Sequence, residues 1–214
     1  MEQLQFLIFN KAFEATLSTP LKCSKDVFVV GCTVGLRFSD LCKIKLQNLE
    51  ERDGYCYLKI KAQKTGIDTM VKLPAYTVDI IQKYRKNKGS LLPTVSLFRF
   101  NQNIKKLAEL AGWVHHIQKE RTKKGLNKQN SGHNTLRFCD ALSSHTMRRT
   151  SITTMLTSGM PEYIVRKISG HTSDSKAFFR YVSLAQSLMD KEIEKMHFYF
   201  RQPQEINSPK GLLT

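Results

Sequence analysis

The spacing of apolar residues restricts the fold that this chain can adopt. Over most of the 214 residues, apolar positions recur every three or four residues, which is the period of an amphipathic helix. Between residues 55 and 73 they alternate instead, so that Cys56, Leu58 and Ile60 would face one way and the residues between them the other. The sequence therefore predicts a mixed, mainly α-helical fold with a small antiparallel β-sheet or hairpin.

The same patterns predict where the elements lie. We expect helices over residues 3–17, 24–33, 77–88 and 101–111, and a helical series from 144 to about 200. Thr19-Pro20 should end the first helix, and Ser39 should cap a short helix that begins at Asp40. The polar stretch 113–140, with its basic centre, predicts a long exposed hairpin or loop, and residues 201–214 predict a mobile tail.

Charge narrows the choice of partner. Lys and Arg number 34 against 18 Asp and Glu, which gives a formal charge of +16. Such a field favours an acidic polymer, DNA or RNA. A membrane surface would also attract it, but the longest apolar run, 27–36, is much shorter than the roughly 20 residues of a spanning helix.

Cysteine usage and the N-terminus indicate a cytoplasmic protein. The cysteines are odd in number and scattered, which indicates reduced packing residues: Cys23, Cys32, Cys42, Cys56 and Cys139. The first ten residues carry a glutamate where a secretory signal needs positive charge, and no cleavage site follows.

Polar residues that could take part in catalysis lie in the last third of the chain. A serine cap followed by a helix places His145 and Arg148, three residues apart, on one face. A later helix ends at Gly170, next to His171, and Tyr181 follows ten residues on. Taken singly, His171 has an ordinary interpretation as a helix-end histidine, and Tyr181 as a core tyrosine.

Taken together, the motifs form an ordered series. GLRFSDL begins at residue 35, KTG at 64, SHTMRRT at 144 and SGH at 169, and RY lies at 180. The series resembles the tyrosine recombinases, or phage-type integrases, over residues 3–197. The SHTxRRT and SGHT forms and the basic insert look most like integrases of Bacteroides-type mobile elements.

The resemblance implies a role for each matching residue. Arg37 and Arg148 would bind the scissile phosphate, Lys64 would be the hairpin lysine, His145 and His171 the paired histidines, Tyr181 the nucleophile, and Asp40 a support for Arg37. Lys59, Lys61 and Lys72 crowd the same hairpin as Lys64. Arg149 stands where many members have histidine.

The resemblance also implies a domain organisation and partners. Residues 1–200 would form the catalytic domain. Because only 36 residues precede Arg37, the chain is expected to lack the small upstream DNA-binding domain. The partner would be double-stranded DNA in a bacterial cytoplasm, with assembly to a tetramer on DNA. An apolar pattern beyond Tyr181 suits either self-association or packing on the chain's own core: Leu184, Leu188, Met189, Ile193, Met196 and Phe200.

The chemistry explains why these residue types occur together. Two guanidiniums can clamp the charge that grows on a phosphate under attack. A phenol with an ordinary pKa near ~10 needs a proton acceptor or cationic surroundings, and a lysine ammonium suits protonation of the leaving 5′ hydroxyl. A phosphotyrosine bond keeps the energy of the broken phosphodiester, so neither ATP, metal nor another cofactor is expected.

Three alternatives remain. A type IB topoisomerase uses similar residues to relax DNA, and a DNA-binding module with a decayed site would keep only the charge. Metal-dependent hydrolysis would use histidines as metal ligands, and the candidates are His115, His116, His133, His145 and His171. The acidic residues are not clustered around these histidines, as such a site would need.

Overall fold

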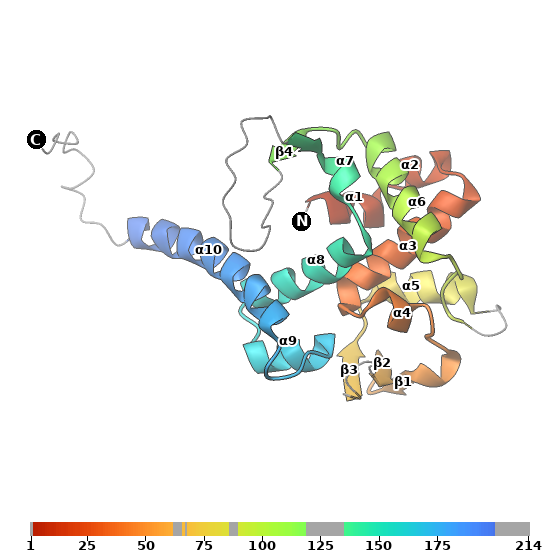
Figure 1. Cartoon of the computed structure of the whole chain (residues 1–214). Coiled ribbons are helices and arrows are strands. Elements are labelled where there is room, and N and C mark those ends of the chain that lie inside the picture. Colours follow the sequence, from red (N-terminus) through yellow and green to blue (C-terminus); the bar gives the residue numbers. More distant parts are fainter. Residues whose placement is uncertain (1, 62–65, 67, 86–89, 119–134, 200–214) are drawn as a thin grey trace, which may run out of the picture.

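A computed structural model describes residues 2–61, 66, 68–85, 90–118 and 135–199 (Figure 1). The helices are α1 (Glu2–Phe9), α2 (Lys11–Thr16), α3 (Thr19–Val34), α4 (Phe38–Leu41), the 3-10 turn η1 (Leu46–Asn48), α5 (Ala75–Tyr84), α6 (Leu97–Leu110), α7 (Phe138–Ala141), α8 (Ser144–Thr157), α9 (Glu162–Ser169) and α10 (Lys176–Tyr199). The strands are β1 (Leu49–Arg52), β2 (Tyr55–Lys61), β3 (Asp68–Lys72), β4 (His116–Gln118) and β5 (Thr135–Arg137). The predicted class, mainly helical with a small antiparallel sheet, is confirmed.

Helix α3 is the centre of the fold. It packs against α1, α5, α6 and α8, and Val27, Val29 and Val30 have no exposed surface. Each such side chain contributes about 1.5–3 kcal/mol by leaving water. The helix ends at Gly35, whose left-handed φ of 69° and N–H bond to the Gly31 carbonyl close it. Arg37 therefore emerges directly from the end of the core helix.

Two predictions about the N-terminal helices are wrong for local reasons. The helix expected over residues 3–17 is broken at Asn10, whose side-chain oxygen accepts the Phe13 N–H at 2.8 Å and so starts α2. Pro20 does not stop a helix. It lies in the first turn of α3, where its missing N–H has no intrahelical partner to lose.

A buried charge network joins α2, α3 and α5. Lys25, only 2% exposed, lies 3.2 Å from Glu14 and 3.0 Å from Asp26, and Lys83 of α5 contacts the same carboxylates. Burial alone would raise the pKa of Glu14, but hydrogen bonds and charge from Lys25 and Lys83 outweigh it and lower the pKa to about 2. The network allows a lysine to be buried in the core.

The expected hairpin belongs to a three-stranded antiparallel sheet of order β1-β2-β3. Strand β1 was not predicted. It pairs with β2 through a turn at Asp53-Gly54, where both residues have positive φ, a conformation typical of this dipeptide. Leu58 and Ile60 face the core as the alternation predicts. Lys64, at the β2–β3 connection, lies outside the described residues.

Helix starts differ from the sequence expectations at two places. Helix α4 begins at Phe38 with Arg37 in the N-cap position, so Ser39 lies inside the helix and does not cap it. Helix α6 begins at Leu97, earlier than expected, because the Ser96 hydroxyl accepts the Arg99 N–H at 3.3 Å. The stretch 113–140 contains the antiparallel pair of β4 and β5, while 119–134 lie outside the description, as do residues 201–214.

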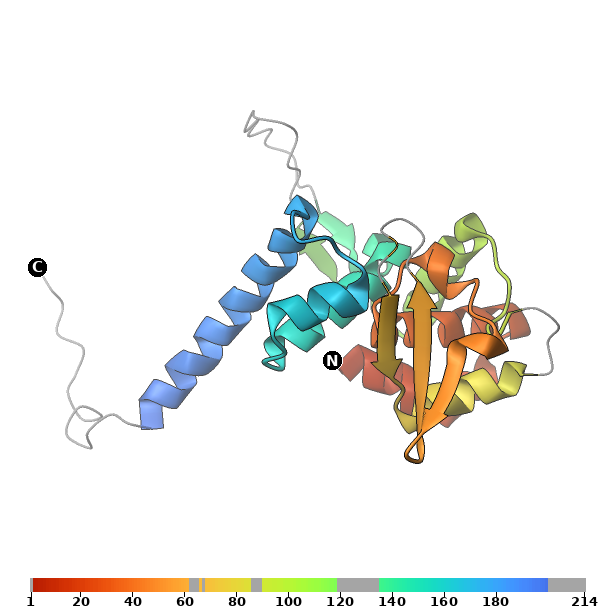
Figure 2. The same ribbon diagram turned by 90° about the horizontal axis from the view of Figure 1, so that it is seen from below.

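The last three helices form a second apolar cluster beside α3. Its buried members come from α8, α9 and α10: Ile152, Leu156, Val165, Phe178 and Ala185. Beyond this cluster α10 runs away from the body, and Figure 2 shows the sheet at the opposite side of the molecule. Among the residues described, no helix has the length and apolarity to span a bilayer.

Candidate functional site

Four of the candidate residues come together where helices end or begin. Arg37 is the N-cap residue of α4, and Arg148 lies in the second turn of α8. His171 follows the glycine that ends α9, and Tyr181 lies in the second turn of α10. The packing of α8 on α3, and of α9 on α8 and β3, thus brings residues more than a hundred positions apart into contact.

Arg148 is the most buried of the four, with 5% of its surface exposed. Its Nη1 donates to the Gly35 carbonyl at 2.9 Å, and its Nη2 lies 3.2 Å from each ring nitrogen of His171. The guanidinium therefore bridges the end of α3 and the residue after α9. Such fixed geometry is what bidentate recognition of a phosphate requires.

Arg37 brings a second guanidinium to the segment that follows α9. It is half-buried, and its two terminal nitrogens lie 3.4 and 3.5 Å from the Gly170 carbonyl. Burial, and then the charge of Arg37, lower the pKa of Arg148 to about 10, although Tyr181 and Asp40 act in the opposite direction. Arg148 stays protonated at neutral pH, so the two cations form a site for an anion.

Asp40 does not make the side-chain contact expected of it. Its carboxylate is buried, and neither oxygen has a hydrogen-bond partner among the described residues. The link from Asp40 to Arg37 is a backbone bond, in which the Asp40 N–H donates to the Arg37 carbonyl at 3.0 Å. The negative charge of Asp40 acts instead on Arg148, where it favours the protonated form.

His171 is buried among cations and aromatic rings. Its Nδ1 lies 2.8 Å from the Ser169 hydroxyl oxygen, and its ring meets those of Phe178 and Tyr181 edge-on, at 5.1 and 6.0 Å between centroids. Burial, followed by the charges of Arg148, Arg37 and Arg166, lowers the pKa of His171 to about 3. The imidazole is therefore neutral at physiological pH.

Tyr181 is half-buried beside His171. Its ring centroid lies 6.1 Å from that of Phe178, which is fully buried and fixes the start of α10. The phenol thus belongs to the same cluster as the two arginines. One region thus holds a phenol, an imidazole and two guanidiniums.

His145 lies at the edge of this cluster. It is in the first turn of α8, which the Ser143 N–H bond to the Thr146 hydroxyl helps to start, and its side chain is exposed. In the described part of the chain, no hydrogen bond or ring contact joins His145 to Arg148, His171 or Tyr181. It faces solvent one turn before Arg148.

The β2–β3 hairpin lies against the end of α9 near the turn that joins its two strands. Thr69 is buried, and its hydroxyl donates to the Lys167 carbonyl at 2.9 Å. This bond connects the first residues of β3 to the helix that precedes His171. The hairpin is thus joined to the cluster close to its turn end.

Three residues of the site were missed by sequence reasoning: Ser169, Arg166 and Thr69. Ser169 carries a signal in the sequence, because a hydroxyl two residues before a helix-end histidine can reach its ring. Arg166 and Thr69 carry none, since both act through backbone carbonyls of other segments. Their roles depend on tertiary packing.

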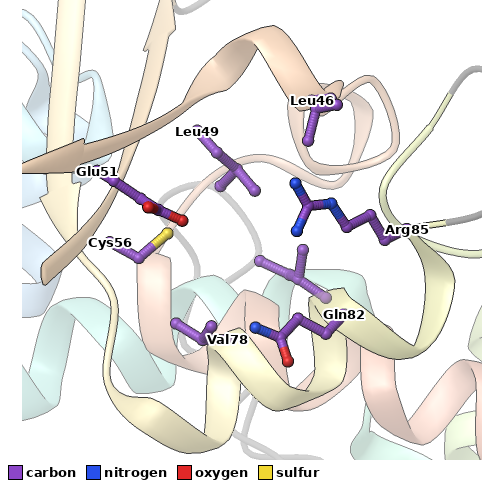
Figure 3. A pocket seen from close by; sticks show the side chains of 8 residues that line it. Leu46, Leu49, Glu51, Cys56, Val78, Gln82 and Arg85 are labelled. Carbon is purple, nitrogen blue, oxygen red and sulfur yellow. The ribbon is translucent and has the colours of Figure 1, made fainter. Parts of the chain in front are cut away.

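A cavity lies elsewhere in the molecule. It has a volume of about 310 Å³ and lies between α5 and the first two strands, where Figure 3 shows Glu51, Cys56, Gln82 and Arg85 among apolar side chains. None of the candidate residues lines it. Within the described residues, no group of three or more His, Cys, Asp or Glu side chains is placed to hold a metal ion.

Comparisons with known proteins show which family and fold this chain shares. Residues 5–187 match the phage integrase family. The tyrosine recombinase XerA of Pyrococcus furiosus is 25% identical over 139 residues, which are 65% of this chain and 43% of that protein.

Solved structures show the same fold. The XerH site-specific recombinase, in a post-cleavage complex with a palindromic difH substrate, matches 90% of this chain and 51% of its own, with a TM-score of 0.60 and 13% identity. The XerA recombinase matches 94% and 64%, with a TM-score of 0.57 and 17% identity. This chain spans less than two thirds of the length of each of these relatives.

Proposed function

Because this chain belongs to the phage integrase family, we propose that residues 1–200 form a catalytic domain that cuts and rejoins DNA through a 3′-phosphotyrosyl bond. The observation that supports this most is the direct contact of Arg148 with His171, whose ring meets that of Tyr181. Nothing in the fold, the site or the comparisons favours the topoisomerase alternative.

In the proposed reaction, Arg37 and Arg148 bind the non-bridging oxygens of the scissile phosphate. In the free protein their guanidiniums donate to the carbonyls of Gly170 and Gly35. A charged phosphate oxygen is a stronger acceptor than a carbonyl, so DNA can replace these bonds at little cost in reorganisation.

The Tyr181 oxygen then attacks phosphorus, and the bond from phosphorus to the 5′ oxygen breaks. The phenol proton passes to His145, which is exposed beside Arg148, and the leaving 5′ oxygen takes a proton from Lys64. A 5′ hydroxyl of another strand reverses these steps and regenerates Tyr181. The arginines stabilise the charge of the transition state, and His171 helps to hold Arg148 in place.

A covalent capture experiment tests this without knowledge of the target sequence. The chain is incubated with nicked duplexes whose cores are randomised, so that the short cleaved fragment diffuses away and the adduct is trapped. We expect a band of protein linked to DNA in a denaturing gel, also in excess chelator. The adduct should disappear in Tyr181→Phe.

Tyr163→Phe is the matched control, because Tyr163 is 72% exposed on α9 and outside the cluster. It should form the adduct at the unsubstituted rate. No adduct with the unsubstituted chain, or an adduct that survives Tyr181→Phe, would overturn the proposal.

We further propose double-stranded DNA as the partner, assembly to a tetramer on DNA, and action in a bacterial cytoplasm as an integrase of a Bacteroides-type mobile element. The +16 charge supports DNA, and exposed apolar side chains on α10 support assembly: Leu184, Met189 and Ile193.

Light scattering tests the assembly. It should give a tetramer with captured duplex and a monomer without it. A monomer on DNA would exclude the assembly.

A further inference from the structure

We propose that Ser169 is a positioning residue for His171: its hydroxyl oxygen accepts the Nδ1 proton, which fixes the tautomer and the plane of the ring under the Arg148 guanidinium. The kinetic consequence of this arrangement rests on the function proposed above. The assignment of the tautomer does not rest on that function.

The surroundings of Ser169 decide which way its hydroxyl bonds. Ser169 is 1% exposed at the last turn of α9, and its oxygen lies 2.6 Å from the Val165 carbonyl and 3.4 Å from that of Arg166. A carbonyl oxygen only accepts hydrogen bonds, so the hydroxyl proton is donated to Val165. The Ser169 oxygen therefore meets a third partner as an acceptor.

That third partner is Nδ1 of His171, at 2.8 Å. Because the oxygen is an acceptor there, Nδ1 must carry the ring proton. A protonated Nδ1 cannot accept from Arg148, although the Arg148 Nη2 lies 3.2 Å from both nitrogens. An Nη2 that is equally far from both nitrogens lies over the face of the ring, so the guanidinium rests on the imidazole that Ser169 orients.

The charges around the ring agree with a neutral tautomer. The groups that face it are the guanidiniums of Arg148 on α8, Arg37 before α4 and Arg166 on α9, and the phenol of Tyr181 on α10. A second ring proton would meet the three cations.

Ser169 thus acts on the phosphate site through one hydrogen bond and the ring that Arg148 contacts. The serine fixes the tautomer and the plane of the ring, and the ring supports the buried guanidinium in the orientation that receives the phosphate. Loss of the hydroxyl frees Nδ1 and allows both tautomers. The ring under Arg148 is then no longer held in one orientation.

The tautomer can be read directly by NMR. In protein with ¹⁵N-labelled histidine, long-range proton–nitrogen correlations distinguish a protonated Nδ1 from a protonated Nε2, and His171→Gln identifies the signals of this ring. We expect the Nδ1-protonated pattern in the unsubstituted chain and in Ser169→Thr, which keeps the hydroxyl. Ser169→Ala should show a mixture of tautomers or the Nε2-protonated form.

Ser24→Ala is the matched control. Ser24 is also fully buried in a helix and accepts one side-chain hydrogen bond, from Asn103 at 2.8 Å, but lies outside the site. It should keep the Nδ1-protonated ring. An Nε2-protonated ring in the unsubstituted chain, or an unchanged ring in Ser169→Ala, would overturn the proposal.

A kinetic measurement completes the test. Single-turnover adduct formation on the randomised nicked duplexes should be about tenfold slower in Ser169→Ala, the upper range for one neutral hydrogen bond. DNA affinity should be unchanged, Ser169→Thr should recover the rate, and an undiminished rate in Ser169→Ala would count against the positioning role. If the unsubstituted chain forms no adduct, the proposed function fails, while the NMR result still decides on Ser169.

Discussion

The buried ring of His171 sits among cations, so its protonation opposes folding. Its pKa lies at about 3 against an ordinary 6.5, because burial and the neighbouring arginines disfavour the imidazolium. Between these values the unfolded chain binds a proton that the folded chain does not. This group therefore stabilises the fold least at low pH, and its penalty grows as pH falls below about 6.5.

The expected result is a difference in pH dependence between variants. From pH 6 to 4, the free energy of unfolding should fall less steeply in His171→Gln than in the unsubstituted chain, by about 1.4 kcal/mol per pH unit at most. Urea denaturation at several pH values measures this. His116→Gln, which removes an exposed histidine, is the control, and equal slopes in all three proteins would contradict the explanation.

The role proposed for Arg148 needs the shape of a guanidinium as well as a positive charge. Arg148→Lys keeps a cation but lacks the planar, fixed donors with which a guanidinium can contact His171 and receive the proposed phosphate. We expect adduct formation to slow by on the order of 10² to 10³, with DNA affinity nearly unchanged. Arg149→Lys, at the exposed neighbouring position, should react normally, and single-turnover rates will decide.

At the scale of elements, the close approach of α3 and α8 positions Arg148. A Cβ on Gly31 of α3 would lie 3.0 Å or less from two atoms of the Met147 side chain, which has no exposed surface. Met147 precedes Arg148, so the two helices can meet here only if one of them lacks a side chain.

Gly31→Ala should therefore destabilise the protein, although alanine favours helix by about 1 kcal/mol over glycine. Overpacking in a filled core costs about 1–3 kcal/mol, so a net loss is expected in thermal or urea unfolding. Gly31→Ala combined with Met147→Ala should show less than the sum of the two losses. Additive losses would mean that the contact does not limit the packing.

The connection from α9 to α10 depends on Arg166. Its Nη1 donates to the carbonyls of Thr172 and Ser173, at 3.1 and 3.2 Å, and its guanidinium carbon lies 4.1 Å from the centre of the Phe178 ring. One side chain thus holds the segment between His171 and the helix of Tyr181.

Arg166→Lys should loosen that segment, because an ammonium cannot bond two carbonyls and stack on a ring in the same way. We expect faster amide hydrogen exchange over residues 172–181 and adduct formation slowed by about tenfold, roughly the loss of one such hydrogen bond. Lys167→Arg, at the exposed neighbour, should leave exchange unchanged. Slow adduct formation with unchanged exchange would contradict a positioning role.

At the scale of the whole molecule, charge should govern how the chain meets DNA. With 34 basic and 18 acidic residues, contacts with phosphates are expected to dominate affinity. Each bound phosphate releases counterions, so affinity should fall steeply with salt.

For about six phosphate contacts, affinity should drop by on the order of 10³ between roughly 50 and 200 mM salt. Fluorescence anisotropy with a random duplex measures this, and Tyr181→Phe should give the same slope, because this substitution removes no basic side chain. A weak salt dependence would contradict electrostatic binding as the main contribution.

Much of the fold was predictable because it depends on neighbours in sequence. Helical spacing in α3, α5, α6 and α8, alternation in β2, and glycines at 35 and 170 all act within a few residues. The errors arose where a local feature outweighed the spacing of apolar residues. The Asn10 cap divides the first expected helix, and Pro20 lies inside the first turn of α3. Strand β1 was missed because its mostly exposed side chains show little alternation.

The sequence by itself determined the order and spacing of the motifs, and hence which residues were candidates. Only the tertiary structure decided that Arg148 bonds Gly35, 113 residues away, and that Arg37 lies on the Gly170 carbonyl, 133 residues away. It also decided that the Asp40 carboxylate bonds neither arginine and that Ser169 reaches His171. Such contacts depend on how helices pack around α3, and a pattern of neighbouring residues carries no record of that packing.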